Sequence, residues 1–242
     1  MSPSRSRAFA VAMVMMGATL VGQAGSWAVP SAEHPVTVAV LYFDYGGKDA
    51  SLEPLRQGLA QMLISDLTSV EGVRVVERER LQEVLREQQL GASGKLDSRT
   101  AARLGKLLGA RYLVLGSYFD ALGTFRADAR LVDVETGEIV KSIGAGGKAD
   151  DFLALEESLA RGLRDAMGPL GQAPGGVPAV APHAAPPRPP RKLKAKTAVT
   201  YGRALMAIDG GDRKGARALL HDVLQEQPDF ALASRDLDRL MR

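Results

Sequence analysis

Cysteine is absent from this chain of 242 residues, and aromatic residues make up 5% of it. Without cysteine there is no disulfide and no thiolate metal ligand, and a bacterial lipid anchor has no residue to attach to. The three histidines fall in separate segments, at positions 34, 183 and 221, so no two of them share a helical turn. We therefore expect neither a metal site nor a cofactor site.

A large excess of charge of one sign is also missing. The formal net charge is +3, and much of the basic surplus gathers in one run near residue 190 that contains no acid. That run consists of Arg188, Arg191, Lys192, Lys194 and Lys196. Because the remaining segments are near neutral, we expect no nucleic-acid partner.

Motifs for nucleotide binding and covalent catalysis are lacking as well. Gly94-Lys95 and Gly147-Lys148 have no glycine five residues before them and no Ser or Thr after them, so neither forms a phosphate-binding loop. No G-x-G-x-x-G is present. An enzyme would have to work with carboxylates and lysines alone, and no pair stands out. We expect a protein that is not an enzyme and has no catalytic residues.

Long apolar runs are limited to the N-terminus. Arg5 and Arg7 precede an apolar run over 8–21, which is shorter than the roughly 20 residues that span a bilayer. Small residues follow, and they predict a signal peptide over 1–28 that is cleaved after Ala28 or after Ala24. An uncleaved membrane anchor is the alternative. Export with cleavage predicts a periplasmic protein.

The alternation of apolar and polar residues after the signal predicts an α/β fold. Strand–helix–strand order implies parallel pairing with right-handed crossovers, and Thr136-Gly137 marks a hairpin. Strands are expected at 36–43, 73–76, 112–119, 125–131 and 139–143, and helical apolar faces at 52–67, 81–85, 101–108 and 152–167. The pattern predicts a mixed, mostly parallel sheet of about five strands flanked by helices.

The order of residues from Val36 to Met167 resembles the curli-secretion (CsgG) family. The resemblance depends on short pieces that are weak singly and fairly specific together: Phe43-Asp44, Glu77-Arg78, Leu81, Glu87-Gln88, Gly94, Ala101, Leu104-Gly105, Gly109-Ala110, Gly116-Ser117 and Leu131-Val132-Asp133. It implies structural roles for Phe43, Asp44, Glu77, Arg78, Glu87, Gly94, Gly105 and Gly116.

Four of these motif residues have specific predicted roles. Asp44 and Glu77 lie near strand ends, where α/β sheets often bind ligands, although helix capping or ion pairing is the structural alternative. Arg78 is expected to pair with Glu87 and to clamp one helix to its neighbour.

The resemblance also implies a function. Known members form an outer-membrane pore that exports amyloid subunits, and others are soluble periplasmic assembly factors. We expect a binding protein for the assembly or transport of envelope or extracellular, curli-like material. Its partners would be envelope or secreted proteins, and the α/β domain could form a homo-oligomer. Peripheral association with the outer membrane stays open, without a lipid anchor.

Two other functions compete with this interpretation. The first is an outer-membrane secretion channel subunit, which the charges of the hairpin over 124–143 disfavour: Arg126, Asp128, Arg130 and Asp133. The second is an activator or sensor of a cell-wall enzyme, a role that has been placed on related domains.

A proline-rich segment, 169–196, follows the predicted α/β domain of 36–168. It has eight prolines and no aromatic residue, so we expect a linker that isolates the C-terminal module of 197–242.

The C-terminal module has small residues at the spacings of a tetratricopeptide repeat. Ala204, Gly211, Ala216, Leu220 and Pro228 fit the helix crossing, the turn and the end of such a unit, and we assign them to repeat packing and interaction. A plain helical hairpin is the alternative. Phe230, Ala231 and Ala233 are expected to begin a further, capping helix. One unit plus this helix should be marginal alone, or should pack on another surface. We expect an exposed apolar groove there that helps to capture a partner.

Overall fold

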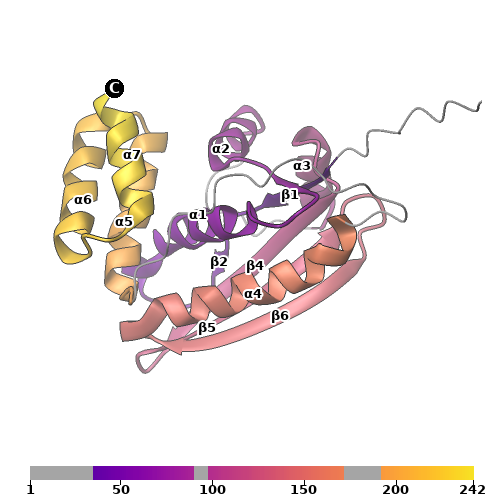
Figure 1. Ribbon diagram of the computed structural model, residues 1–242, viewed down its shortest axis with the longest axis horizontal. Coiled ribbons are helices and arrows are strands. Elements are labelled where there is room, and N and C mark those ends of the chain that lie inside the picture. Colours follow the sequence, from indigo (N-terminus) through magenta and orange to yellow (C-terminus); the bar gives the residue numbers. More distant parts are fainter. Residues whose placement is uncertain (1–34, 90–97, 172–191) are drawn as a thin grey trace, which may run out of the picture. The chain divides into compact units, whose positions relative to one another are not determined.

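The structure is a computed structural model that describes residues 35–89, 98–171 and 192–242. These residues form an α/β fold, as predicted, with a mixed sheet of six strands flanked by helices (Figure 1). The predicted signal peptide, Gly94 and residues 172–191 of the predicted linker lie outside the described ranges. No helix in the described ranges is long and apolar enough to cross a membrane.

The sheet combines a short parallel part with a long antiparallel part. Its strands are β1 (Val36–Val40), β2 (Asp44–Tyr45), β3 (Val73–Val75), β4 (Tyr112–Ala121), β5 (Thr124–Asp133) and β6 (Ile139–Lys148). Their order is β3-β1-β4-β5-β6, and β2 pairs with β4 beside this path. β1 runs parallel to β3 and β4, whereas β4, β5 and β6 are antiparallel. The sequence predicts every strand except the two-residue β2.

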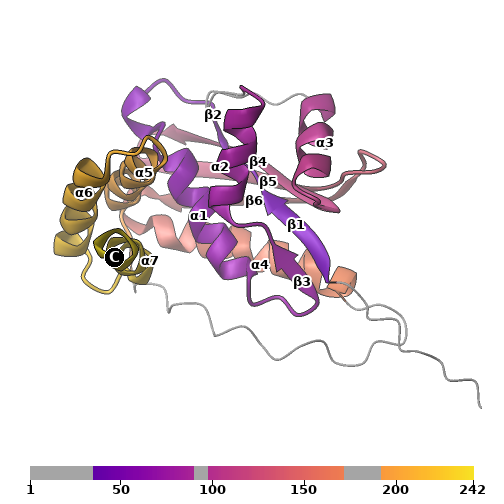
Figure 2. The same ribbon diagram turned by 90° about the horizontal axis from the view of Figure 1, so that it is seen from above.

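Seven helices accompany the sheet in the described residues, of which the first four lie on its two faces and the last three form a C-terminal group. They are α1 (Leu55–Leu67), α2 (Arg78–Glu87), α3 (Ser98–Leu107), α4 (Phe152–Gly171), α5 (Ala195–Asp209), α6 (Arg213–Glu226) and α7 (Ala231–Met241), with short 3-10 turns η1 (Ala50–Leu52) and η2 (Ala149–Asp151). α4 packs along β5 and β6, and α3 lies on the opposite side of the sheet (Figure 2).

The long strands follow the alternation of their sequence. Along β5 the small and apolar residues are buried beneath α4, and the residues between them face the other way, where Arg126 and Arg130 are exposed. The β4–β5 turn consists of Leu122 and Gly123, both with positive φ (51° and 76°), which is the two-residue geometry of a tight hairpin.

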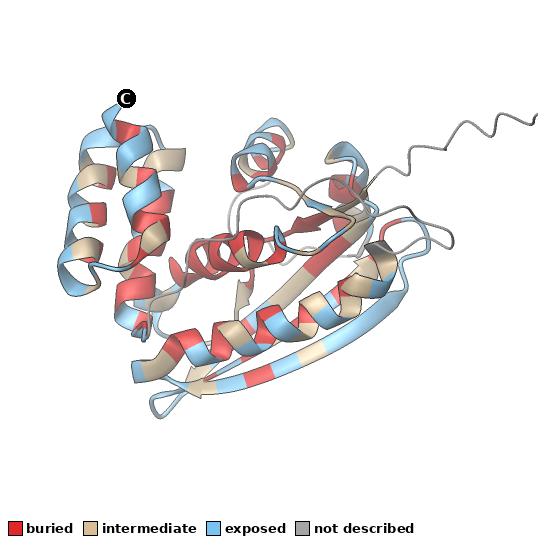
Figure 3. Ribbon diagram, in the orientation of Figure 1, coloured by how far each residue is buried: buried red, intermediate tan, exposed pale blue. Residues whose placement is uncertain are grey.

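The C-terminal helices pack on the α/β domain through α1. Two glycines make this crossing close: a Cβ on Gly202 of α5 would lie 1.9 Å from the Pro54 carbonyl oxygen, and one on Gly58 of α1 would lie 2.9 Å from that of Ala198. α1 is consequently buried along nearly its whole length (Figure 3). The prediction that the linker isolates this module is therefore wrong, and the alternative, packing on another surface, is confirmed.

Candidate functional site

A first polar cluster lies where β1 ends and contains the motif residues Phe43 and Asp44. Arg56 of α1, whose side chain is nearly buried, donates from Nε to the Phe43 carbonyl oxygen at 2.8 Å and approaches Asp44 Oδ1 at 3.5 Å. The Phe43 ring occupies the space above Gly116 of β4, where a Cβ would lie 2.2 Å from the ring. Asp44 thus takes part in an ion pair, which was the structural alternative to ligand binding.

Two tyrosines complete this cluster. Tyr45 and Tyr118 stack with ring centroids 5.0 Å apart, the Tyr45 hydroxyl contacts the Asp120 carboxylate, and the Tyr118 hydroxyl donates to the Leu52 carbonyl oxygen at 2.8 Å. Burial, followed by the hydrogen bond with Asp120, raises the pKa of Tyr45 to about 12. Burial also raises the pKa of Tyr118. Both hydroxyls are therefore neutral donors at physiological pH, and they tie β2, β4 and η1 together.

A second cluster joins the motif residue Arg78 to the C-terminal helices. Arg78 begins α2 and is 1% exposed, and its Nη1 donates to both carboxylate oxygens of Asp209 on α5, at 2.6 and 2.7 Å. Burial lowers the pKa of Arg78, but Asp209, Tyr42 and Glu79 together more than offset this, so the net pKa is raised. Arg78 Nε has no hydrogen-bond partner within the described ranges. The pair is a largely buried, charge-assisted connection between two parts of the chain, in which one guanidinium nitrogen contacts both carboxylate oxygens.

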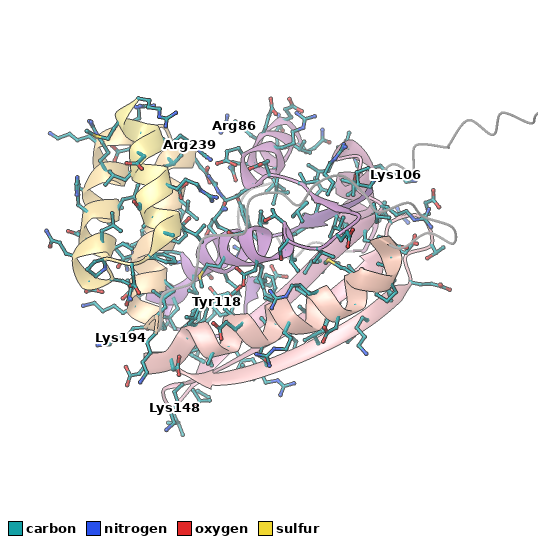
Figure 4. The ribbon with its side chains drawn as sticks, in the orientation of Figure 1. Arg86, Lys106, Tyr118, Lys148, Lys194 and Arg239 are labelled. Atoms are coloured by element: carbon teal, nitrogen blue, oxygen red, sulfur yellow. The ribbon has the colours of Figure 1, made fainter. Side chains whose placement is uncertain are left out.

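The surroundings of this pair are partly polar. The Tyr42 hydroxyl donates to Gln82 Oε1 at 2.9 Å, and burial raises the pKa of Tyr42 to about 12. Burial also raises the pKa of the Asp209 carboxyl, although Arg78 acts in the opposite direction. At the exposed edge, Arg239 of α7 pairs with Glu79 of α2 at 2.8 Å. Figure 4 shows Arg86 and Arg239 where α2 and α7 face each other.

The remaining motif residues have more local surroundings. Glu77 is exposed at the N-terminus of α2 and makes no capping bond with its side chain. Glu87 is exposed at the other end of this helix, while the ion pairs of Arg78 go to Asp209 and Glu79. The predicted Arg78–Glu87 clamp is therefore wrong. Gly105 of α3 packs against Val134, because a Cβ there would lie 2.6 Å from the Val134 side chain.

The predicted repeat residues occupy the helical module as follows. Ala204 of α5, and Ala216 and Leu220 of α6, are fully buried where these helices pack together. Gly211 has a φ of +80° in the turn between them, and Pro228 is exposed after the end of α6. The predicted further helix is confirmed as α7, which packs on α6.

Sequence reasoning missed Asp209, Gly58 and Gly202, the residues that connect the two parts. Gly58 and Gly202 interrupt helical patterns, and a glycine inside a helical pattern often marks a close approach of another backbone. Asp209 had no such signal, because its partner is 131 positions away in the sequence.

One sheet face has no helix over most of its antiparallel strands within the described residues. Phe119 is 44% exposed on β4, and Arg126, Asp128 and Arg130 of β5 project from the same side. Arg126 and Asp128 form an ion pair at 2.9 Å. α3 covers the other end of this face near Leu113. We call the patch formed by Phe119, Arg126, Asp128 and Arg130 the open face. Over 35–89, 98–171 and 192–242, no three His, Asp or Glu side chains gather as metal ligands would.

Comparison with known proteins gives several remote likenesses. No curated protein sequence matches the chain. The C-terminal domain of LpoB from Salmonella enterica is 14% identical, with a TM-score of 0.34 over 49% of this chain and 87% of that one. Lipoprotein GNA1162 from Neisseria meningitidis is 17% identical, with a TM-score of 0.38 over 47% and 81%. A PelC dodecamer from Paraburkholderia phytofirmans is 17% identical, with a TM-score of 0.27 over 57% and 89%.

The sequence model of one protein family matches part of the chain directly. It is described as the curli production assembly/transport component CsgG, and it matches residues 28–121. The matched stretch contains β1 to β4 and α1 to α3, together with the Phe43, Asp44 and Arg78 positions. The tetratricopeptide-like assignment of the C-terminal helices stays a prediction. The chain thus contains a CsgG-like segment that ends with β4.

Proposed function

We propose that this protein is a non-enzymatic periplasmic binding protein that acts in the assembly or transport of envelope or extracellular, curli-like material. The observation that carries the proposal is the match of residues 28–121 to the CsgG family, whose description names curli assembly and transport. Envelope or secreted proteins are the partners that this role requires.

The distribution of polar groups supports a binding role. In both polar clusters the charged groups hold structural elements together: Arg56 joins α1 to the end of β1, and Arg78 joins α2 to α5. The open face, by contrast, presents an aromatic ring beside charges of both signs. Aromatic and arginine side chains are enriched in protein interfaces, and charges at such a surface select the partner.

The helical module can add to this binding through the sides that α1 leaves free. Met206 of α5 is 45% exposed and Met241 of α7 is 66% exposed. Methionine is flexible and polarizable and adapts to varied apolar partners. We therefore propose that the open face supplies the main contact and that the helical module supplies a second one.

Photo-crosslinking in the native bacterium tests this proposal. A photoreactive phenylalanine analogue replaces Phe119 on the open face, and a control replaces Arg161, which is exposed on α4. We expect discrete crosslinks to envelope or secreted proteins from position 119 and none from position 161. Deletion of the gene should deplete a surface or extracellular component, and wild type should restore it. An unchanged envelope together with no crosslink at position 119 would refute the proposal.

A further inference from the structure

The strand β6 is the outermost strand at one end of the sheet. It is ten residues long and pairs with β5 on its inner side. On its outer side, no strand of the described residues pairs with it. Long exposed edges are usually shortened, covered or interrupted by proline, because their free N–H and C=O groups pair readily with another chain.

The hairpin geometry identifies which backbone groups of β6 point outward. Ala121 and Thr124 close a two-residue turn, so they form a hydrogen-bonded pair, and such pairs recur at every second residue along β4 and β5. The residues between them on β5 bond instead to β6, where their partners are Lys141, Ile143, Ala145 and Gly147. The N–H and C=O groups of the alternate β6 residues therefore point away from the sheet: Ser142, Gly144 and Gly146.

Small residues leave this outer edge flat. Gly144 gives room to the Arg126–Asp128 ion pair, because a Cβ there would lie 2.6 Å from Arg126 Nη2 and 2.8 Å from Asp128 Oδ1. At Gly146 a Cβ would lie no closer than 3.6 Å to its nearest neighbour, the Phe125 carbonyl oxygen. No proline occurs in β6. Another strand can therefore approach without a steric barrier.

We propose that β6 is a self-association site, at which the β6 strand of a second copy of this chain pairs antiparallel about a two-fold axis at Gly144. In this register Ser142 of each copy faces Gly146 of the other, and the three outward pairs exchange roughly six backbone hydrogen bonds. This inference goes beyond the proposed binding role and does not depend on it.

The charges of β6 agree with pairing to a second copy. In the two-fold register Lys141 lies opposite Gly147, and Lys148 lies opposite Val140, so no like charges face each other. Lys148 is exposed at the end of β6 (Figure 4), and Glu138 is exposed just before its start. Antiparallel pairing brings Lys148 of one copy near Glu138 of the other. A surface that complements itself in this way is what an isologous dimer requires.

Exposed apolar residues lie on the same strand. Ile139 is 53% exposed and Val140 is 43% exposed at the start of β6. In the two-fold register the second copy covers them with the end of its own β6. The dimer therefore combines backbone pairing with burial of apolar surface.

A proline scan with mass measurement tests the proposal. Gly146→Pro removes an outward N–H that β5 does not use, and an edge strand tolerates proline at such a position. Gly146→Ala is the matched control, because it keeps the N–H and its Cβ makes only an ordinary contact, at 3.6 Å from the Phe125 carbonyl oxygen. By light scattering at micromolar concentrations, we expect dimers for wild type and Gly146→Ala, and at least tenfold weaker dimerisation for Gly146→Pro. A wild-type monomer throughout, or a larger ring that Gly146→Pro leaves intact, would overturn it.

An introduced cysteine gives a second readout that does not require proline to be tolerated. The chain has no cysteine of its own, so a single substitution is unique. Gly144→Cys places two sulfurs beside the two-fold axis, and the exposed ends of Arg126 and Asp128 must shift to admit the new side chain. Ser117→Cys, exposed on the same sheet face of β4, is the control. Under mild oxidation we expect a disulfide-linked dimer from Gly144→Cys and none from Ser117→Cys. Equal crosslinking of the two variants, or none at position 144, contradicts the register.

Discussion

The helix α1 and the strand β6 differ most clearly in how far their residues are buried. Of the thirteen residues in α1, twelve are buried, because α4 and α5 both pack against it. Of the ten residues in β6, one is buried. The contrast indicates that the surface of α1 is used within the chain, where it holds the C-terminal helices to the α/β domain. The exposed surface of the described sheet lies elsewhere, on the edge strand β6 and on the open face.

Breaking the Arg78–Asp209 ion pair should have the largest effect on the free energy of unfolding. Arg78→Ala leaves Asp209, whose side chain is 13% exposed, without its partner, and removal of one member of such a largely buried pair costs up to about 3–5 kcal/mol. Urea unfolding at neutral pH measures this loss. Arg80→Ala is the control on the same helix: its pair with Glu83 is exposed on both sides and should cost about 1 kcal/mol or less. Equal losses in the two variants would mean that the Arg78 pair is not buried in solution.

Adding a methyl group where α5 crosses α1 should have the next largest effect on the free energy of unfolding. Gly202→Ala drives a methyl group against the Pro54 carbonyl oxygen, and overpacking of this kind costs about 1–3 kcal/mol. Gly168→Ala on α4 is the matched control, because a Cβ there meets nothing within 4 Å and alanine favours the helix by up to about 1 kcal/mol. Thermal unfolding should therefore shift in opposite directions for the two variants. A stabilised Gly202→Ala protein would show that α5 does not cross α1 closely.

Buried carboxyls predict how stability changes with pH. Glu156 of α4 is buried and its Oε1 has no hydrogen-bond partner among the described residues, and burial raises the pKa of Glu156 well above its ordinary value. Burial raises the pKa of Asp66 on α1 as well. A raised pKa in the folded state means that stability is full below the unfolded pKa and is lost as pH rises through the folded pKa.

The measurable consequence is greater stability near pH 5 than near pH 8. Each pKa unit of difference between the folded and unfolded states is worth about 1.4 kcal/mol. Urea midpoints across this range should fall as pH rises, and Glu156→Gln, which cannot ionise, should flatten the profile. A slope that Glu156→Gln leaves unchanged would place the titration elsewhere in the molecule.

The exposed ion pair between α7 and α2 should contribute least to the free energy of unfolding. Arg239→Ala removes the contact with Glu79, in which both side chains are about half exposed, and we expect a loss of less than about 1 kcal/mol that vanishes at high salt. Equilibrium unfolding at low and high salt checks this. A loss as large as that of Arg78→Ala would erase the distinction between the buried and exposed pairs.

The sequence was most informative where a short pattern determines the structure. The alternation of β5 and the hairpin after Asp133 predict the antiparallel strands, and the residues from Phe43 to Gly116 predict the CsgG-like segment. The docking of α5 on α1 could not be predicted in the same way. Its determinants, Gly58, Gly202 and the Arg78–Asp209 pair, are far apart in sequence. The two glycines indicate a close approach but not its partner, and Asp209 carries no signal within its own helix. The proline-rich segment pointed to independence, although a long connection between two elements does not prevent them from packing together.

The central claim, that α1 holds the C-terminal helices to the α/β domain, can be tested by cutting the chain between them. A specific protease site placed within residues 172–191 allows cleavage of the purified protein, followed by size-exclusion chromatography at micromolar concentration. We predict that the fragment with the α/β domain and the fragment with α5, α6 and α7 elute together, and that Arg78→Ala weakens or abolishes their association. Separate elution of two folded wild-type fragments would contradict the account.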